Sequence, residues 1–158
     1  MVKQQVKILL NIGAIKFYGN IYIYMVDKVK ITYKGQSKMV PKTYVQGLTG
    51  YDRQKQIKSI FEGTNRPKTK FKSKRSGWVK KFEDKYNKKI TDEKWIHENI
   101  ITRTGQRKIK DKGMKAYYTS GSRPNQNPYS WGFARLASVI LNGPSRKIDI
   151  NEWEKYKR

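Results

Sequence analysis

The sequence predicts a mainly α (α+β) fold, in which a compact helical domain follows a short β-rich N-terminal arm. Three observations support this prediction. Apolar residues recur at helical spacing after Pro41, whereas the first forty residues are rich in β-branched and aromatic side chains. A length of 158 residues suits one domain rather than two. The aromatic content of 13% is too high for a disordered basic tail, so we expect the chain to fold.

The arm, residues 1–40, begins with a predicted hairpin. Its strands are residues 15–18 and 21–26, and the intervening Gly19 and Asn20 favour a two-residue turn. Met25 is an alternative start residue, which would make the first 24 residues dispensable.

A second pair of strands is expected next in the arm. Residues 29–33 (VKITY) alternate apolar and polar side chains, as a half-buried strand does. Residues 34–36 are expected to form a turn, and residues 37–40 to pair back along the strand.

The helical domain, residues 41–149, is expected to open with a helix over residues 53–62. Asp52 is its expected N-cap and Gly63 its expected end. The apolar residues of this stretch share one face: Ile57, Ile60 and Phe61.

Two further helices are predicted from their caps and apolar stripes. Ser76 is the expected cap of the first, and Thr91 or Asp92 of the second. Their inward-facing residues are expected to be Trp78, Val79, Phe82 and Tyr86, and then Trp95, Ile96 and Ile100.

The last third of the chain is expected to be divided by a long loop. A short basic piece at residues 106–112 is expected to end at Gly113, and residues 117–129, with two prolines and a glycine, are expected to be irregular. Residues 130–141 leave little polar face and predict the most buried helix. Gly143 and Pro144 stop that helix, and residues 150–158 form a C-terminal tail or a short amphipathic helix.

The charge balance predicts an anionic partner. The 36 lysines and arginines outnumber the 12 aspartates and glutamates, which gives a formal net charge of +24. The field of such a chain attracts phosphates or acidic protein surfaces.

The densest basic stretch is residues 66–75 (RPKTKFKSKR). In an extended chain the cations at 66, 68, 70, 72 and 74 would lie along one edge, about 6.6 Å apart, with Phe71 on the other face. That spacing is close to the roughly 6–7 Å between phosphates of one strand. The alternative is a solvated linker between two helices. The residues expected to contact nucleic acid or an acidic surface are Arg53, Lys55, Lys58, Arg66, Lys68, Lys70, Lys72, Lys74, Arg75, Lys80 and Lys81.

A second candidate contact is the polar loop that precedes the buried helix. Its hydroxyls, amides and one cation, next to a helix N-terminus, could bind an anion or a partner's backbone. The expected contact residues are Ser120, Ser122, Arg123, Asn125 and Gln126. The alternative is a self-bonded connection that packs Tyr117, Tyr118 and Tyr129 onto the core.

No catalytic, cofactor or metal site is predicted. Cysteine is absent and His97 is the only histidine, which excludes thiol chemistry and thiolate zinc sites. Phosphate-loop and dinucleotide fingerprints are also missing. The triplets at residues 83–85 (EDK) and 92–94 (DEK) resemble the carboxylate–lysine endings of metal-dependent nucleases, but surface helix pairs explain them better. We therefore expect a binding protein rather than an enzyme.

Aromatic side chains interleaved with lysine can stack on single-stranded bases. Trp78, Trp95 and Trp131 fall at helical core spacing, so we expect them in the core. Tyr22 and Tyr24 in the arm are the freer candidates for stacking.

From about residue 41 to 149, the order of motifs resembles an uncharacterised domain family of the nucleocytoplasmic large (giant) DNA viruses. The residues that carry the resemblance are 52–60 (DRQKQIKSI), 66–70 (RPKTK), 76–78 (SGW), 82–86 (FEDKY), 116–126 (AYYTSGSRPNQ) and 130–140 (SWGFARLASVI). The resemblance implies a viral setting and supplies no catalytic residues.

These features predict a minor structural, capsid-associated protein of a large DNA virus particle. It would dock through its basic surface onto acidic capsid proteins or the packaged genome, and be found in the virion and, during assembly, in the host cytoplasm or viral factory. The alternative is a non-specific nucleic-acid-binding protein acting in the infected cell. No membrane span is expected, because apolar stretches are interrupted well before the roughly 20 residues that a crossing needs.

Overall fold

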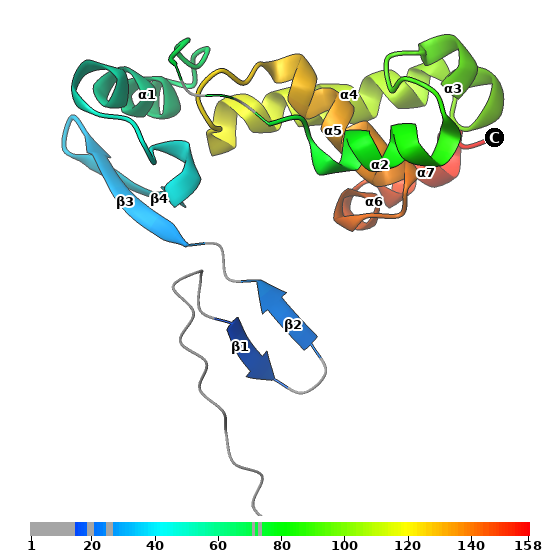
Figure 1. The fold of residues 1–158 in the computed structure, drawn as a ribbon. Coiled ribbons are helices and arrows are strands. Elements are labelled where there is room, and N and C mark those ends of the chain that lie inside the picture. The colour runs from blue at the N-terminus through cyan, green and yellow to red at the C-terminus, as the bar shows by residue number, and fades with distance from the viewer. Residues whose placement is uncertain (1–14, 19–20, 25–26, 71, 73) are drawn as a thin grey trace, which may run out of the picture.

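The computed structural model describes residues 15–18, 21–24, 27–70, 72 and 74–158. In this part of the chain two β-hairpins precede a short 3-10 helix and a set of α-helices, which confirms the predicted mainly α fold with a β-rich N-terminal part (Figure 1). The elements are β1 (Ile15–Tyr18), β2 (Ile21–Tyr24), β3 (Lys28–Tyr33), β4 (Gln36–Pro41), η1 (Lys42–Tyr44), α1 (Gly50–Glu62), α2 (Gly77–Tyr86), α3 (Glu93–Asn99), α4 (Arg103–Ser120), α5 (Pro128–Ile140), α6 (Pro144–Ile148) and α7 (Ile150–Tyr156).

The first hairpin has the predicted register. β1 and β2 pair antiparallel, with Tyr18 opposite Ile21 at the turn. The predicted turn residues Gly19 and Asn20 lie outside the described residues, as do residues 25 and 26 and the side chains of the two candidate stacking tyrosines in β2.

The second hairpin turns over two residues rather than three. Lys34 and Gly35 both have positive φ angles, 47° and 77°, as a tight hairpin turn requires. Gln36, predicted to belong to the turn, instead begins β4 opposite Tyr33.

A small hydrophobic cluster joins the second hairpin to α1. The predicted apolar face of α1 supplies it, because Ile60 is buried there and Ile57 and Phe61 pack against it. The buried members are Ile31, Val40, Val45 and Ile60, each at most 3% exposed. The hairpin is therefore fastened to the helical domain by burial of apolar surface.

Helix α1 begins earlier than predicted. Thr49 occupies the N-cap position in an extended conformation, so the prediction of Asp52 as the cap is wrong. Asp52 lies in the first turn, where its carboxylate still suits the positive end of the helix dipole. Gly63 ends the helix in the left-handed conformation, as predicted (φ 62°).

The caps predicted for the next two helices are confirmed. The Ser76 side chain accepts a hydrogen bond from the backbone of Trp78 at the start of α2. The Asp92 side chain accepts one from Trp95 at the start of α3.

A larger hydrophobic cluster fills the space between α2, α3, α4 and α5. Phe82, Ile96, Ile109 and Leu136 are each 0% exposed within it. Its other buried members are Val79, Ile90, Ile101, Ala137, Val139 and Ile140. As predicted, α5 is the most deeply buried of the described helices. Five consecutive residues, beginning with Leu136, are buried.

Helix α4 is the main departure from the sequence prediction. It runs without a break from Arg103 to Ser120, so Gly113 does not end a helix and the predicted loop from residue 117 begins only at Gly121. Gly113 is instead the point of closest approach to α5: a Cβ there would lie 2.7 Å from the Trp131 carbonyl oxygen. Packing between two helices, which a local pattern does not reveal, explains the glycine.

Helix α5 starts at Pro128, two residues before the predicted start, and the Asn127 side chain caps it by accepting from Ser130. At its other end, Arg146 closes the helix. The Arg146 guanidinium donates to the carbonyls of Val139 (2.5 Å) and Ile140 (2.9 Å), and burial lowers its pKa.

The C-terminal residues form α7, which packs Trp153 and Tyr156 against the larger cluster. Asp149, between α6 and α7, is 0% exposed and accepts two hydrogen bonds from Arg135 (2.6 and 2.9 Å) and one from Lys112 (3.1 Å). Three segments are thus held by one buried carboxylate.

The described helices form an elongated body. Figure 1 shows α1 and the β3–β4 hairpin at one end, α3 and α7 at the other, and α4 and α5 running side by side between them. The two hydrophobic clusters are separate, and polar contacts bridge them. Within the described residues, none of the helices has both the length and the hydropathy that a membrane crossing requires.

Candidate functional site

The basic segment between α1 and α2 exposes a row of lysines. Lys68, Lys70, Lys72 and Lys74 are all exposed, and none has an ion-pair partner among the residues that the structure describes. Pro67, just before the row, and Thr69, within it, are half-buried, so exposure alternates from residue 67 to 70 as expected of an extended chain. Phe71, the expected anchor on the opposite face, lies outside the described residues.

Arg66 does not belong to this row. It is 5% exposed, and its guanidinium donates to the carbonyls of Ser59 (2.7 Å), Thr64 (2.5 Å) and Tyr117 (2.7 Å). Burial lowers its pKa. The expectation that Arg66 would contact an external anion is therefore wrong, because all of its bonds go inward.

The other arginine of the segment is also engaged. Arg75 forms an ion pair with Glu83 on α2 at 2.5 Å, although its side chain stays 58% exposed. The arginines at the two ends of the segment are thus committed to the protein, while the lysines between them point to solvent. Such a division suits the fixed, forked geometry of guanidinium and the hydrated point charge of ammonium.

The polar loop before α5 is largely bonded to the protein itself. The Asn125 side chain accepts from the backbone N–H of Thr69 (2.7 Å) and donates to the Thr69 carbonyl (2.9 Å), which fixes the loop to the basic segment. Ser122 is 0% exposed, and its carbonyl accepts from Gln56. The Ser130 hydroxyl donates to Gln126.

These bonds favour the self-bonded interpretation for part of the loop. Ser122 cannot reach an outside partner, and Ser120 is the last residue of α4 rather than a loop residue. Tyr117 packs inside as that interpretation expected, but Tyr129 is 68% exposed and does not. Arg123 remains a candidate contact, since it is half-buried and has no acidic partner among the described residues.

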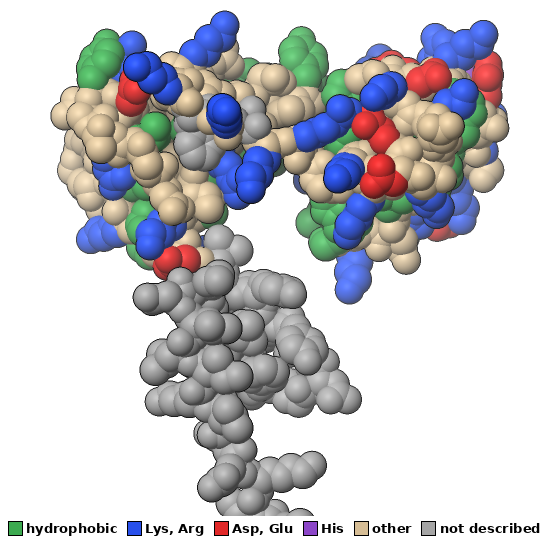
Figure 2. Space-filling model, viewed as in Figure 1, with side chains coloured by type: hydrophobic (Ala, Val, Ile, Leu, Met, Phe, Trp, Pro, Cys, Tyr) green, Lys and Arg blue, Asp and Glu red, His purple; other side chains and the backbone are tan. Residues whose placement is uncertain are grey.

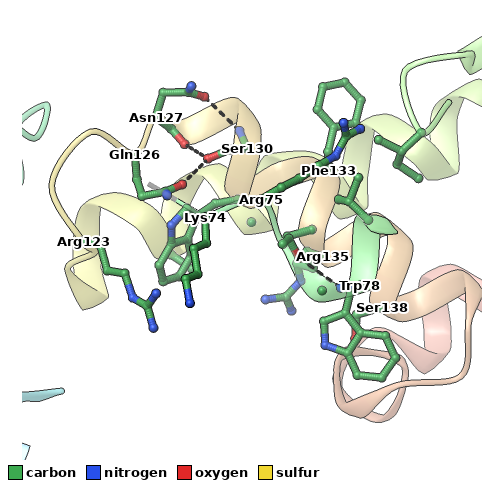
Figure 3. Close-up of a pocket in the computed structure, with 18 of the residues that line it drawn as sticks. Lys74, Arg75, Trp78, Arg123, Gln126, Asn127, Ser130, Phe133, Arg135 and Ser138 are labelled. Carbon is green, nitrogen blue, oxygen red and sulfur yellow. Dashed lines mark hydrogen bonds between the residues drawn. The ribbon is translucent and has the colours of Figure 1, made fainter. Parts of the chain in front are cut away.

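A groove of about 1000 Å³ opens where the basic segment, the loop, α2 and α5 meet. Figure 3 shows Lys74 and Arg123 at one side of the groove and the indole of Trp78 at the other, near Ser138, and Arg135 also lines the groove. Other polar lining residues are Arg75, Gln126 and Ser130, and other apolar ones are Val79, Trp131, Phe133 and Ala134. The groove thus combines positive charge with aromatic surface.

Tyr44 contributes a hydroxyl-bearing ring to the same groove. Burial raises the pKa of Tyr44, and the charges of Arg123 and Arg66 oppose this shift without cancelling it. The tyrosine therefore stays neutral at physiological pH and adds no negative charge to the groove.

A second groove of about 850 Å³ shares residues 125–127 with the first. Lys68 and the exposed Tyr129 line it, together with Tyr118, whose hydroxyl donates to Asn65 at 3.2 Å.

The expected basic residues do not form one continuous site. Lys74 and Arg75 meet the loop in the first groove and Lys68 meets it in the second, whereas Lys55 and Lys58 on α1 and Lys80 and Lys81 on α2 line neither. Arg53 is half-buried and donates to the Val45 carbonyl at 3.2 Å. Figure 2 shows basic side chains over both ends of the elongated body and on the narrow strip between them.

Sequence analysis missed Trp78 and Trp131 as site residues, because their helical spacing assigned them to the core. Both are only half-buried, and both line the first groove. Trp78 follows Lys74 and Arg75 closely, in the run KRSGW, and this proximity to cations was the available signal for it.

The acidic triplets have structural partners. Glu83 accepts from Arg75, Asp92 caps α3, and Glu93 pairs with Lys110 on α4. His97 contacts the side chain of Arg158 and accepts from the backbone of Arg103. No cluster of three metal-ligating side chains occurs within the described residues.

A family model described as "Family of unknown function (DUF5824)" matches residues 41–153. The chain belongs to the DUF5824 family. This match spans α1 to α6, the start of α7, the basic segment and the groove, so the candidate site lies wholly within the family's domain. No curated protein and no solved structure matches the chain. The viral setting inferred from the motif order stays a prediction.

Proposed function

We propose that this DUF5824 member is a non-catalytic docking protein of a large DNA virus particle, which attaches through its basic surface to acidic capsid proteins or to the packaged genome. The observation that carries the proposal is the row of four exposed lysines in the basic segment, Lys68, Lys70, Lys72 and Lys74, none of which has an ion-pair partner in the part of the chain that the structure describes. Charges repeated along an exposed segment match a partner with regularly spaced negative groups, which a phosphate backbone provides.

A second candidate is non-specific nucleic-acid binding in the infected cell. The first groove favours this function, because it places aromatic surface beside cations. An acidic protein surface would need the cations but not the aromatic rings.

The test is binding of duplex DNA by the full chain across a salt series. One variant changes Lys68, Lys70, Lys72 and Lys74 to Gln. A matched control removes the same charge from exposed lysines outside both grooves, by changing Lys28, Lys30, Lys94 and Lys147 to Gln.

If the lysine row contacts phosphates, the first variant lowers the slope of log K against log salt by about three to four, and the control lowers it by less than about one. Equal losses in the two variants would mean that net charge alone attracts DNA. Binding that disappears by physiological salt would exclude the genome as partner and leave an acidic protein surface.

A further inference from the structure

Two cations in the first groove are left without an acidic partner. Arg75 and Arg135 also line it, but Glu83 and Asp149 engage them. Lys74 and Arg123 have no such contact among the described residues, and they come from different segments of the chain: one from the basic segment, the other from the loop before α5. Figure 3 shows both at one side of the groove. The groove therefore holds two positive charges free for an external anion.

The indole of Trp78 lines this groove. A Cβ on Gly143 would lie 2.7 Å from its Cη2 atom, so the ring edge packs closely against the backbone of Gly143. The ammonium of Lys81 lies 4.9 Å from the ring centroid. A flexible lysine over an aromatic ring is easily displaced, and its charge would then be available to a phosphate. Trp78 thus adds a half-buried aromatic surface to the groove, with a lysine side chain over its ring.

We propose that the first groove binds an unpaired nucleotide of a single-stranded nucleic acid. The base would stack on Trp78, and the adjoining phosphates would contact Lys74 and Arg123. Lys74 is also the last lysine of the exposed row, so the strand leaving the groove continues along Lys72, Lys70 and Lys68. The inference rests on the proposed function in its nucleic-acid form.

Single strands fit this arrangement better than duplexes or acidic peptides do. Stacking on an aromatic side chain requires a base that is not already paired and stacked within a helix. An acidic peptide satisfies the cations but gains nothing from the indole. A volume of about 1000 Å³ also lies at the upper end of the range typical of small-molecule sites, which accommodates a nucleotide.

The test compares an oligothymidylate of about 12 nucleotides with a duplex of the same length, using the full chain at one salt concentration. Trp78→Leu is the main variant. Trp95→Leu is its matched control, because Trp95 is also half-buried on the larger cluster but lies outside the groove. We expect Trp78→Leu to weaken single-strand binding about tenfold and duplex binding by less than about twofold. The control should change both by less than about twofold.

A second variant does not depend on the core tolerating loss of an indole. Changing Lys74 and Arg123 to Gln removes the two groove cations that have no acidic partner among the described residues, and changing Lys94 and Lys147 to Gln removes two exposed cations that line neither groove. The first pair should weaken oligothymidylate binding about tenfold or more, and the second pair by only about twofold to threefold. Thermal unfolding of each variant confirms that it is folded.

Any of three results overturns the inference. The first is equal weakening of binding by the two tryptophan variants, and the second is equal weakening by the two double variants. In the third, a polyglutamate peptide displaces the bound oligothymidylate as effectively as unlabelled oligothymidylate does. If the lysine row still sets the salt slope for duplex DNA while the groove variants change nothing, the groove inference fails and the proposed function stands. If neither the oligothymidylate nor the duplex binds, the groove inference and the nucleic-acid form of the proposed function both fail.

Discussion

Arg66 and Tyr117 are joined by three contacts. The backbone N–H of Arg66 donates to the Tyr117 hydroxyl (2.7 Å), the Arg66 guanidinium donates to the Tyr117 carbonyl (2.7 Å), and the guanidinium carbon lies 4.8 Å from the ring centroid. The Tyr117 hydroxyl also donates to the Gln126 carbonyl (3.0 Å). This one pair therefore connects the basic segment, α4 and the loop before α5.

Removing the hydroxyl of Tyr117 should destabilise the protein. In Tyr117→Phe, the buried N–H of Arg66 and the carbonyl of Gln126 both lose a partner, so the free energy of unfolding should fall by about 1–3 kcal/mol. Urea denaturation measures the change. Tyr118→Phe is the control, because that hydroxyl makes an exposed contact with Asn65, and its loss should cost less than about 0.5 kcal/mol. Equal losses would contradict the role assigned to Tyr117.

Arg66 should contribute to stability and not to DNA binding. Arg66→Lys keeps the charge, but an ammonium cannot satisfy three carbonyls in the geometry of a guanidinium. We expect a loss of about 1–3 kcal/mol in the free energy of unfolding, measured in urea, with an unchanged salt slope for duplex DNA. A reduced slope with intact stability would return Arg66 to the binding surface.

The buried carboxylate of Asp149 should be indispensable to the fold. Asp149→Asn leaves Arg135 without its acidic partner in a largely buried site, which typically costs about 3–5 kcal/mol. Glu152→Gln removes the more exposed partner of Lys112 and should cost less than about 1 kcal/mol. Thermal or urea unfolding distinguishes the two. A small loss for Asp149→Asn would mean that water replaces the carboxylate.

The carboxylate of Asp149 should also make the free energy of unfolding depend on pH. Burial alone would raise the pKa of Asp149, but the hydrogen bonds of Arg135 and Lys112 outweigh it, and the pKa is lowered. The stabilisation is therefore complete above the unfolded value of about 3.9 and is lost as the pH falls through the lower folded value. Unfolding measured from pH 6 down to about pH 2 should show this loss. In Asp149→Asn the acid limb should be shallower, and an identical limb would exclude Asp149 as its source.

The close approach of α4 and α5 should exclude even a methyl group at Gly113. Gly113→Ala would place a Cβ 2.7 Å from the Trp131 carbonyl and 2.8 Å from the Cα of Gly132, so it should destabilise by about 1–3 kcal/mol despite the better helix propensity of alanine. Gly77→Ala in the first turn of α2 meets nothing within 4 Å and should be neutral or stabilising by up to about 1 kcal/mol. Thermal unfolding of the two variants provides the comparison.

Local pattern was sufficient for much of the fold. The turn between β3 and β4, the caps Ser76 and Asp92 and the left-handed Gly63 all depend on side chains or backbone freedom within a few residues. Helix α4 was not predicted as one element: the sequence predicted a short basic piece ending at Gly113 and a loop from residue 117, because glycine and the polar residues after Tyr118 are typical of a helix end. What makes that helix continuous is its contact with α5, and such a contact joins positions distant in sequence.

The candidate site was predictable in composition but not in arrangement. Alternation correctly places Lys68 and Lys70 on the exposed side, yet Arg66 obeys the same alternation and is buried. Its direction is set by carbonyls on α1 and α4 that no pattern in the basic segment encodes. Trp78 likewise satisfies a helical stripe, yet it is only partly buried against the larger cluster and lines the groove.

The polar bridge between the two hydrophobic clusters bears on how the molecule unfolds. The contacts that span them, such as Gln56 with the Ser122 carbonyl and Arg66 with Tyr117, are hydrogen bonds rather than shared apolar surface. Only a few hydrogen bonds therefore couple the unfolding of the hairpin end to the unfolding of the helical end. The smaller cluster should open first, with faster amide hydrogen exchange in β3, β4 and α1 than in α4 and α5. A variant that breaks the bridge should convert one melting transition into two.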